Sequence, residues 1–279
     1  MISVIIPAHN EEAVIERGLR ALLEGAEPGE VEVIVACNGC TDRTAEKARA
    51  FGHGVRVVEI PQASKTAALN AADCVASCFP RIYVDADVVL PLSAARKVAR
   101  VLERDEALLA SPVVQTDTRE SSAVVRAFYD VWLNLPYNRV MVGTGVYGLS
   151  ERGRARFGEF PPVIADDGFV RSRFEPEDRA AVEDAVVTVA AVRTLGDLIR
   201  VKTRVRVGLY QLQRYSSGAQ VTDRKDAREI VGSLPVSLLL PWKLFVYVAV
   251  SSVVRLRARR RMNGDRSLGW DRDHASRTV

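Results

Sequence analysis

Four short apolar runs dominate the first third of the chain, and the first three are each followed by a segment of helical character. The runs are Ile2–Ile6, Val31–Ala36, Val55–Ile60 and Ile82–Val84. Strands separated by helices at this spacing pair in parallel, and the helices then cover both faces of the sheet. The sequence therefore predicts an α/β fold with a mostly parallel central sheet.

The segments between the runs carry helix-start signals. Asn10 is predicted to cap the first helix, and Thr41 or Asp42 to start the second. A third helix is predicted over 64–77. These starts follow the carboxyl ends of the strands, which is where open α/β sheets bind their ligands.

Polar side chains gather in the loops at that predicted edge: His9, Asn38, Asp42, Lys65, Asp85 and Asp87. Asp85 and Asp87 repel each other unless a cation lies between them. The pair therefore indicates either a divalent-metal site or a solvated strand end. Neither the dinucleotide motif Gly-x-Gly-x-x-Gly nor a P-loop is present, which argues against dinucleotide oxidoreductases and P-loop NTPases.

Two later motifs add to this picture. A glycine-rich turn at Gly143-Thr144-Gly145 leads into a strand, and glycine there permits close backbone approach to a ligand. A second acidic pair, Asp166-Asp167, follows. From the residues alone, either acid of this pair can cap a helix.

Four segments in this order resemble family 2 glycosyltransferases: Ile5–Glu12, Asn38–Thr44, Ser64–Asn70 and Asp85–Asp87. The resemblance covers roughly Ile2 to Gly208. It implies a GT-A-like nucleotide-binding sandwich, a nucleotide-sugar donor and an inverting transfer. It also implies Mn²⁺ or Mg²⁺ near the Asp-x-Asp motif.

The resemblance assigns roles to individual residues. Asp87, helped by Asp85, would hold the metal. Asp167, with Asp166 as the alternative, would be the base, and Gly143, Thr144 and Gly145 would lie on the acceptor side. The residues implied to contact the donor are Pro7, Ala8, Asn10, Glu12, Asn38, Asp42, Lys65, Asp85, Arg204 and Arg206.

The chain departs from the family pattern in two places. Cys37 stands where the family usually has an aspartate that binds the base, and a thiol is a poor acceptor. We expect base recognition to shift to Asn38, Asp42 or backbone groups, which leaves uridine and guanosine donors open. The Gln-x-x-Arg-Trp motif of processive synthases is missing, which favours transfer of one sugar per encounter.

Positive charge is concentrated near the C-terminus, where residues 193–262 hold 15 Lys or Arg against 4 Asp or Glu. Within this region Leu234–Val254 is mostly apolar. Lys243 would lie at mid-span of a transmembrane helix, at a cost of about 2.5–3.5 kcal/mol. We therefore expect residues 234–261 to lie in a membrane interface rather than to span it. A core helix or an oligomer contact is the other alternative.

The predicted organisation is a catalytic domain at 1–220, a helical membrane-associated extension at 221–262 and a polar tail at 263–279. The predicted function is non-processive transfer of a sugar to a saccharide or lipid-linked hydroxyl, in the synthesis of cell-envelope polysaccharide. We expect it at the cytoplasmic face of the membrane, with no nucleic acid as partner. The alternatives are a nucleotidyltransferase on a related fold and a catalytically degenerate, membrane-bound scaffold.

Overall fold

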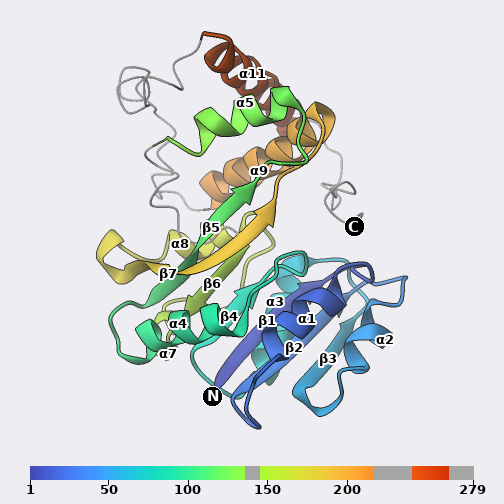
Figure 1. The fold of residues 1–279 in the computed structure, drawn as a ribbon, viewed down its shortest axis with the longest axis vertical. Coiled ribbons are helices and arrows are strands. Elements are labelled where there is room, and N and C mark those ends of the chain that lie inside the picture. The colour runs from blue at the N-terminus through green and yellow to red at the C-terminus, as the bar shows by residue number, and fades with distance from the viewer. Residues whose placement is uncertain (136–144, 216–240, 264–279) are drawn as a thin grey trace. The chain divides into compact units, whose positions relative to one another are not determined.

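The computed structural model describes residues 1–135, 145–215 and 241–263 of the 279-residue chain (Figure 1). Its contacts divide the chain into two compact units. The first comprises Met1–Gln115 and Val142–Val189, and the second comprises Thr116–Met141 and Ala190–Val279. The predicted domain boundary near residue 220 and the predicted tail beyond Asn263 lie outside the described residues.

A seven-stranded sheet runs in the order β3-β2-β1-β4-β6-β5-β7. Its strands are β1 (Ile2–Ala8), β2 (Val31–Asn38), β3 (Val55–Ile60), β4 (Arg81–Val84), β5 (Leu109–Asp117), β6 (Val146–Leu149) and β7 (Arg179–Ala190). The first four strands pair in parallel, as predicted. β6 is antiparallel to both β4 and β5, so the sheet is mixed and its N-terminal half is the parallel part.

Helices cover both faces of the parallel half. They are α1 (Ile15–Leu23), α2 (Thr44–Arg49), α3 (Lys65–Val75) and α4 (Leu92–Glu103), and three short segments follow later in the unit, α7 (Glu151–Arg154), α8 (Asp166–Arg171) and the 3₁₀ turn η2 (Pro176–Asp178). Side chains of α1, α2 and α4 form one core with alternate residues of β1 and β2. The intervening residues Ile5 and Ile34 are also fully buried, and α3 contacts the same two strands. Because successive strand residues face opposite sides, α3 covers the other face.

The predicted cap of the first helix is wrong. α1 begins at Ile15 and has no side-chain cap, whereas Asn10 adopts a left-handed conformation with φ of 52°. Asn tolerates this conformation, and its side-chain oxygen accepts a hydrogen bond from the Thr41 backbone at 2.6 Å instead. The start predicted near residue 64 is confirmed, because the Ser64 side chain caps α3 by accepting from the Ala67 backbone at 3.3 Å.

A buried ionic cluster joins α3, β4 and α7. Asp73 on α3 accepts hydrogen bonds from the Tyr83 hydroxyl and from Arg81, each at 2.8 Å, and pairs with Arg154. The Asp73 side chain is buried, and both arginines are largely buried. Buried ions of this kind are tolerated only when they are fully paired.

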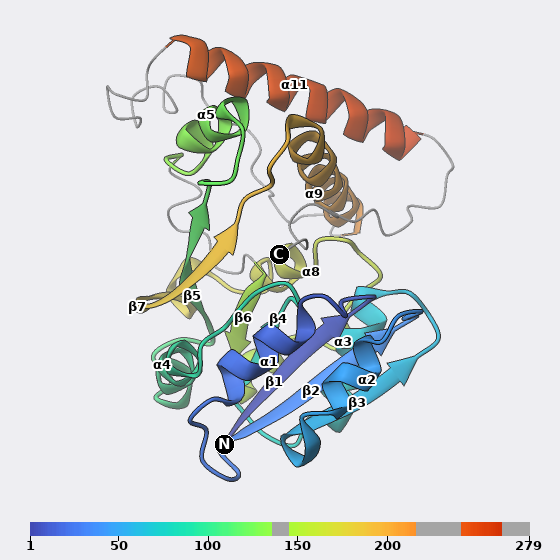
Figure 2. The ribbon, with the colours of Figure 1, turned by 45° about the vertical axis from the view of Figure 1, so that its right-hand side comes forward.

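The described residues of the second unit form three helices, α5 (Ala123–Trp132), α9 (Leu195–Tyr215) and α11 (Pro241–Asn263), and α11 packs against both others (Figure 2). Val125, Leu198 and Val254 contribute to their shared core. Lys202 lies 3.3 Å from the centre of the Trp132 ring, and Lys243 pairs with Asp130 at 2.7 Å. Within residues 1–135, 145–215 and 241–263, no helix has the length and apolar character that crossing a bilayer requires.

Replacing Asp73 by alanine is expected to destabilise the first unit, because it leaves two partly buried arginines without their counter-charge. The expected loss in unfolding free energy is about 3–5 kcal/mol, measured by chemical denaturation. The matched control is Asp184→Ala, which removes the exposed partner of Lys97 and should change stability little. Equal losses of unfolding free energy for the two substitutions would contradict the stabilising role of the buried Asp73 cluster.

Candidate active site

Lys65 lies between the two acidic motifs. Its Nζ atom is 2.6 Å from Oδ1 of Asp85, which follows β4, and 2.8 Å from Oδ1 of Asp166, which begins α8. The side chain of Asp166 is only 4% exposed, compared with 19% for Lys65 and 36% for Asp85. The ammonium group of Lys65 therefore joins two carboxylates that are 81 residues apart in the sequence.

The charges in this cluster change one another's ionisation. Burial opposes the charge on Lys65, but Asp166 and Asp85 outweigh it and raise the pKa of Lys65 above its ordinary value. Burial raises the pKa of Asp166 to about 6, although Lys65 acts in the opposite direction. Burial also raises the pKa of Asp167. The cluster thus places weakly acidic carboxyl groups beside a firmly protonated lysine.

The two neighbouring acids have different surroundings. Both lie in the first turn of α8. Asp166 is buried against Lys65, whereas Asp167 is half-buried and its Oδ1 accepts a hydrogen bond from the Gly168 backbone at 2.7 Å. Asp167 is therefore the acid that a molecule from solvent can reach more easily.

Gly145 shapes the turn that carries Asp85. The Asp85 backbone N–H donates to the Gly145 carbonyl at 2.8 Å, and Gly145 has a φ of 78°. A Cβ atom there would lie 3.1 Å from a Val88 methyl group and 3.3 Å from Oδ2 of Asp85. Only glycine fits this position without strain. Gly143 and Thr144, the other residues predicted on the acceptor side, lie outside the described residues.

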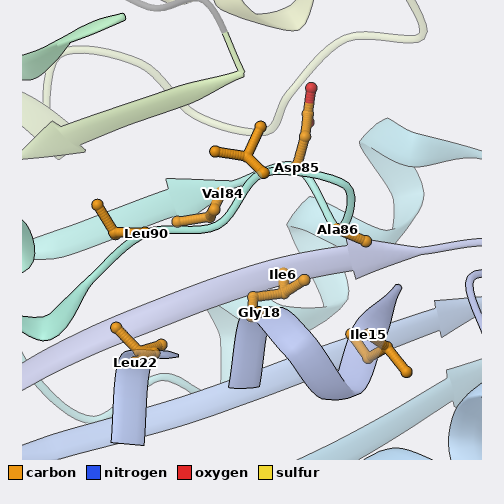
Figure 3. Close-up of a pocket in the computed structure, with 9 residues that line it drawn as sticks. Ile6, Ile15, Gly18, Leu22, Val84, Asp85, Ala86 and Leu90 are labelled. Atoms are coloured by element: carbon orange, nitrogen blue, oxygen red, sulfur yellow. The ribbon is translucent and has the colours of Figure 1, made fainter. Parts of the chain in front are cut away.

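A small cavity of about 10 Å³ lies beneath the same turn, between α1, β1 and β4. Its lining is apolar and includes Ile6, Ile15, Leu22 and Val88, and Figure 3 shows the Asp85 carboxyl group pointing away from Ile15 and Leu22. A volume of this size barely admits one water molecule. The cavity is a gap in the core, and the chemistry belongs to the opposite side of the Asp85 turn.

The Asp85–Asp87 turn fits a divalent cation of the Mg²⁺ or Mn²⁺ type. Asp87 is exposed and Asp85 is half-buried, so one turn presents two carboxylates. Across the described ranges, no group of three or more His, Cys, Asp or Glu side chains is placed to hold a metal by itself. Proteins bind Mg²⁺ through one or two carboxylates together with substrate phosphates, so the two carboxylates of this turn suit it.

The predicted donor-binding residues in the loops that follow β1 and β2 lie close together. Many of their polar atoms, however, form hydrogen bonds within and between these two loops. Asn38 is buried and its side-chain nitrogen donates to the Ala8 carbonyl at 2.8 Å. Glu12 accepts from the Arg43 backbone at 3.2 Å, and Asp42 accepts from the Glu12 backbone at 3.2 Å. These bonds fix the loops that follow β1 and β2. A direct role of the loops in binding the donor stays a prediction.

The remaining predicted donor residues differ in location. Pro7 and Ala8 are buried at the end of β1, opposite Ala36 and Cys37 of β2. Hydrogen bonding with Cys40 and burial raise the pKa of the Cys37 thiol well above its ordinary value, so Cys37 is neutral. Arg204 and Arg206 belong to α9 in the second unit, whereas the acidic cluster belongs to the first unit.

Two contributors to the site were missed by sequence reasoning. The Tyr147 ring of β6 stacks on Tyr83 with centroids 5.0 Å apart, and burial, with Asp166 the strongest of the nearby charges, raises its pKa well above normal. The Asn70 side chain makes two hydrogen bonds with the backbone of Phe160, at 3.0 and 2.8 Å. Asn70 thereby fastens the loop that leads to α8. Asn70 ends a motif singled out in the sequence and Tyr147 follows the glycine-rich turn, but their partners are distant and left no local signal.

Lys65→Met is expected to lower the unfolding free energy by about 3 kcal/mol at neutral pH, because Asp166 loses its buried counter-ion. The loss should shrink toward acidic pH, since a protonated Asp166 needs no cation. Denaturation curves at several pH values measure this effect. The control is Lys97→Met, which removes the partner of the exposed Asp184. A loss for Lys65→Met that does not vary with pH would contradict the ion-pair explanation.

This chain is similar to known proteins in sequence and in fold. The chain matches the model of glycosyl transferase family 2 over residues 3–146. The comparison with curated proteins gave no significant match. Two solved proteins have a similar fold. A mannosyltransferase from Pyrobaculum calidifontis, in complex with GDP-Man and Mn²⁺, has a TM-score of 0.63 at 23% identity, over 94% of this chain and 78% of that chain.

The second similar structure is glucosyl-3-phosphoglycerate synthase from Mycobacterium tuberculosis, in complex with Mn²⁺, UDP-Glc and phosphoglyceric acid. It has a TM-score of 0.58 at 23% identity, over 77% of this chain and 79% of that chain. These similarities confirm the predicted GT-A-like fold. Because the family model covers more than half of the residues, the chain belongs to glycosyl transferase family 2 and is a glycosyltransferase.

Proposed function

We propose that this glycosyltransferase moves a sugar from a nucleotide-sugar donor to an acceptor hydroxyl with inversion at the anomeric carbon. The observation that carries the proposal is the pairing of Lys65 with both Asp85 and Asp166. Through this pairing, Lys65 joins the Asp85–Asp87 turn, which suits a metal-bound diphosphate, to the start of α8, which carries a candidate base. The two proteins of similar fold were solved with GDP-Man and with UDP-Glc.

The donor diphosphate binds beside the Asp85–Asp87 turn. Asp87 is exposed and serves as the principal carboxylate for the metal, with Asp85 supporting it from its contact with Lys65. A divalent metal, when bound there, neutralises the negative charge that grows on the departing nucleoside diphosphate. Lys65 adds a fixed positive charge at the same edge.

Asp167 acts as the base on the acceptor side. Inverting transfer needs a carboxylate that takes the hydroxyl proton while the acceptor oxygen attacks the anomeric carbon and the bond to the diphosphate breaks. Asp167 suits this role because it is half-buried and accessible, whereas Asp166 is buried against Lys65. Asp166 instead keeps Lys65 and the start of α8 in place.

The remaining parts of the proposal concern the two substrates. The acceptor is a saccharide or lipid-linked hydroxyl of the cell envelope, and absence of the processive-synthase motif supports transfer of one sugar at a time. Arg204 and Arg206 provide guanidinium groups suited to phosphate. We place the activity at the cytoplasmic face of the membrane, where a lipid-linked acceptor and the basic C-terminal region meet.

A donor screen tests the activity directly. The full chain is incubated with UDP-, GDP- and dTDP-sugars and Mn²⁺, and the released nucleoside diphosphate is measured. We expect release from one nucleotide class, by transfer or by slow hydrolysis. Pyrophosphate as the released product would indicate nucleotidyl transfer instead. Absence of both binding and turnover for every donor would support the scaffold alternative.

Asp167→Asn is expected to lower kcat by about 10²–10⁴-fold, the usual contribution of a general base. The KM for the donor should change little, because the residue acts on the acceptor. Asp166→Asn should retain more of kcat than Asp167→Asn, and the exposed control Asp184→Asn should match the wild type. A larger loss for Asp166→Asn would reassign the base.

Asp87→Ala is expected to abolish transfer and to remove the dependence of donor binding on Mn²⁺. Titration calorimetry with the donor, with and without Mn²⁺, measures this dependence separately from turnover. Chelator treatment of the wild type should reproduce the loss. Full activity of the wild type in chelator would exclude the metal role of this turn.

The pH profile of kcat/KM should fall on the acid side near pH 6. Above that pH Asp166 is ionised, and below it Asp166 takes up a proton and weakens its hold on Lys65. Burial also raises the pKa of Asp167, so Asp167 loses its capacity to accept a proton at a higher pH than an ordinary aspartate does. A profile that stays flat down to about pH 4, the ordinary range of an exposed aspartate, would contradict this assignment.

A further inference from the structure

Helix α11 has an apolar stripe on the side that faces away from its own helical core. Val250, Val254 and Ala258 are buried. Large side chains elsewhere on the helix are exposed: Trp242 by 48%, Phe245 by 73%, Val248 by 58% and Leu256 by 53%. Trp242, Phe245 and Val248 are spaced three residues apart and share one helix face, and Leu256 lies on the same face about two turns beyond Val248, past the exposed Ser252. We call these four apolar residues the α11 stripe.

The charges on α11 are sorted along its length. Arg255, Arg257, Arg259, Arg260 and Arg261 occupy its C-terminal part, and the helix contains no Asp or Glu. Lys243 lies in the apolar part, but it is largely buried and pairs with Asp130 of α5 at 2.7 Å. Lys243, the one cation in the apolar half of α11, is therefore neutralised within the helical core. The arginine-rich end of α11 lies next to the stripe.

We propose that the α11 stripe docks onto the surface of an anionic lipid bilayer, with the helix lying in the membrane plane. Helices with an apolar face and a basic part bind at the interface, and each arginine near an anionic surface adds to the attraction. The occupant is an anionic surface because α11 carries five arginines beside the stripe and no Asp or Glu of its own to neutralise them. The inference does not depend on the identity of the transferred sugar.

Vesicle sedimentation with the full chain tests this surface. The probes are vesicles of phosphatidylcholine alone and vesicles that also contain phosphatidylglycerol. The wild type should bind the anionic vesicles, and added salt should weaken the binding. Phe245→Asp should reduce binding by about tenfold or more. The combined change Arg255→Gln, Arg259→Gln and Arg260→Gln should reduce it by about fivefold per arginine and remove the preference for anionic lipid.

The matched control is Val186→Asp, which places the same charge at an exposed apolar position of β7 in the first unit and should leave vesicle binding unchanged. Circular dichroism and donor turnover without vesicles check that each variant is folded. Unchanged binding by Phe245→Asp and the arginine variant would overturn the proposal. The proposal would also be overturned if sedimentation velocity showed a dimer without lipid that Phe245→Asp dissociates, while vesicle binding persisted. The stripe would then join two copies of the chain.

Discussion

The shared ammonium group of Lys65 is the interaction on which the catalytic edge depends. Asp166 is almost completely buried, and an ionised carboxylate at such a position needs a partner within bonding distance. Lys65 supplies it and also contacts Asp85, so the turn after β4 and the start of α8 are held by one cation. In the proposed mechanism, the donor side and the acceptor side of the reaction are therefore positioned together. A shift of Lys65 would leave the buried carboxylate of Asp166 without its counter-charge.

Several weaker interactions keep these charged groups on rigid elements. Gly145 allows β6 to approach the Asp85 turn closely, and Asn70 fastens the loop before α8 to the helix that carries Lys65. The paired Asp73 joins α3 to β4 and α7. Helix α3 thus contributes both the cation of the site and two of its supports. Such supports matter because a catalytic group displaced by even 1 Å loses much of its effect.

In the second unit, the charged side chains have different roles. Lys202 stacks against aromatic rings of α5, and Lys243 pairs with Asp130, so both lysines serve the packing of the helices. The arginines of α11 instead lie in the exposed end of the helix, next to an exposed apolar stripe. A lysine in an apolar run argued against a membrane span at the level of sequence. Its partner Asp130 explains why the run tolerates it, and the proposed interfacial location does not require it to enter lipid.

The sequence by itself determined the parallel half of the sheet, the start of α3 near Ser64 and the order of the glycosyltransferase motifs. These features are encoded in short runs, in which burial and helix capping act between near neighbours. Only the tertiary structure decided that β6 pairs antiparallel between β4 and β5, that Asn10 bonds Thr41 and does not cap α1, and that Asp166 is buried while Asp167 is accessible. The pairings of Lys65 with Asp166 and of Lys243 with Asp130 also needed it. Each of these depends on residues far apart in the chain, whose contact follows from packing of whole elements and leaves no periodic pattern in the sequence.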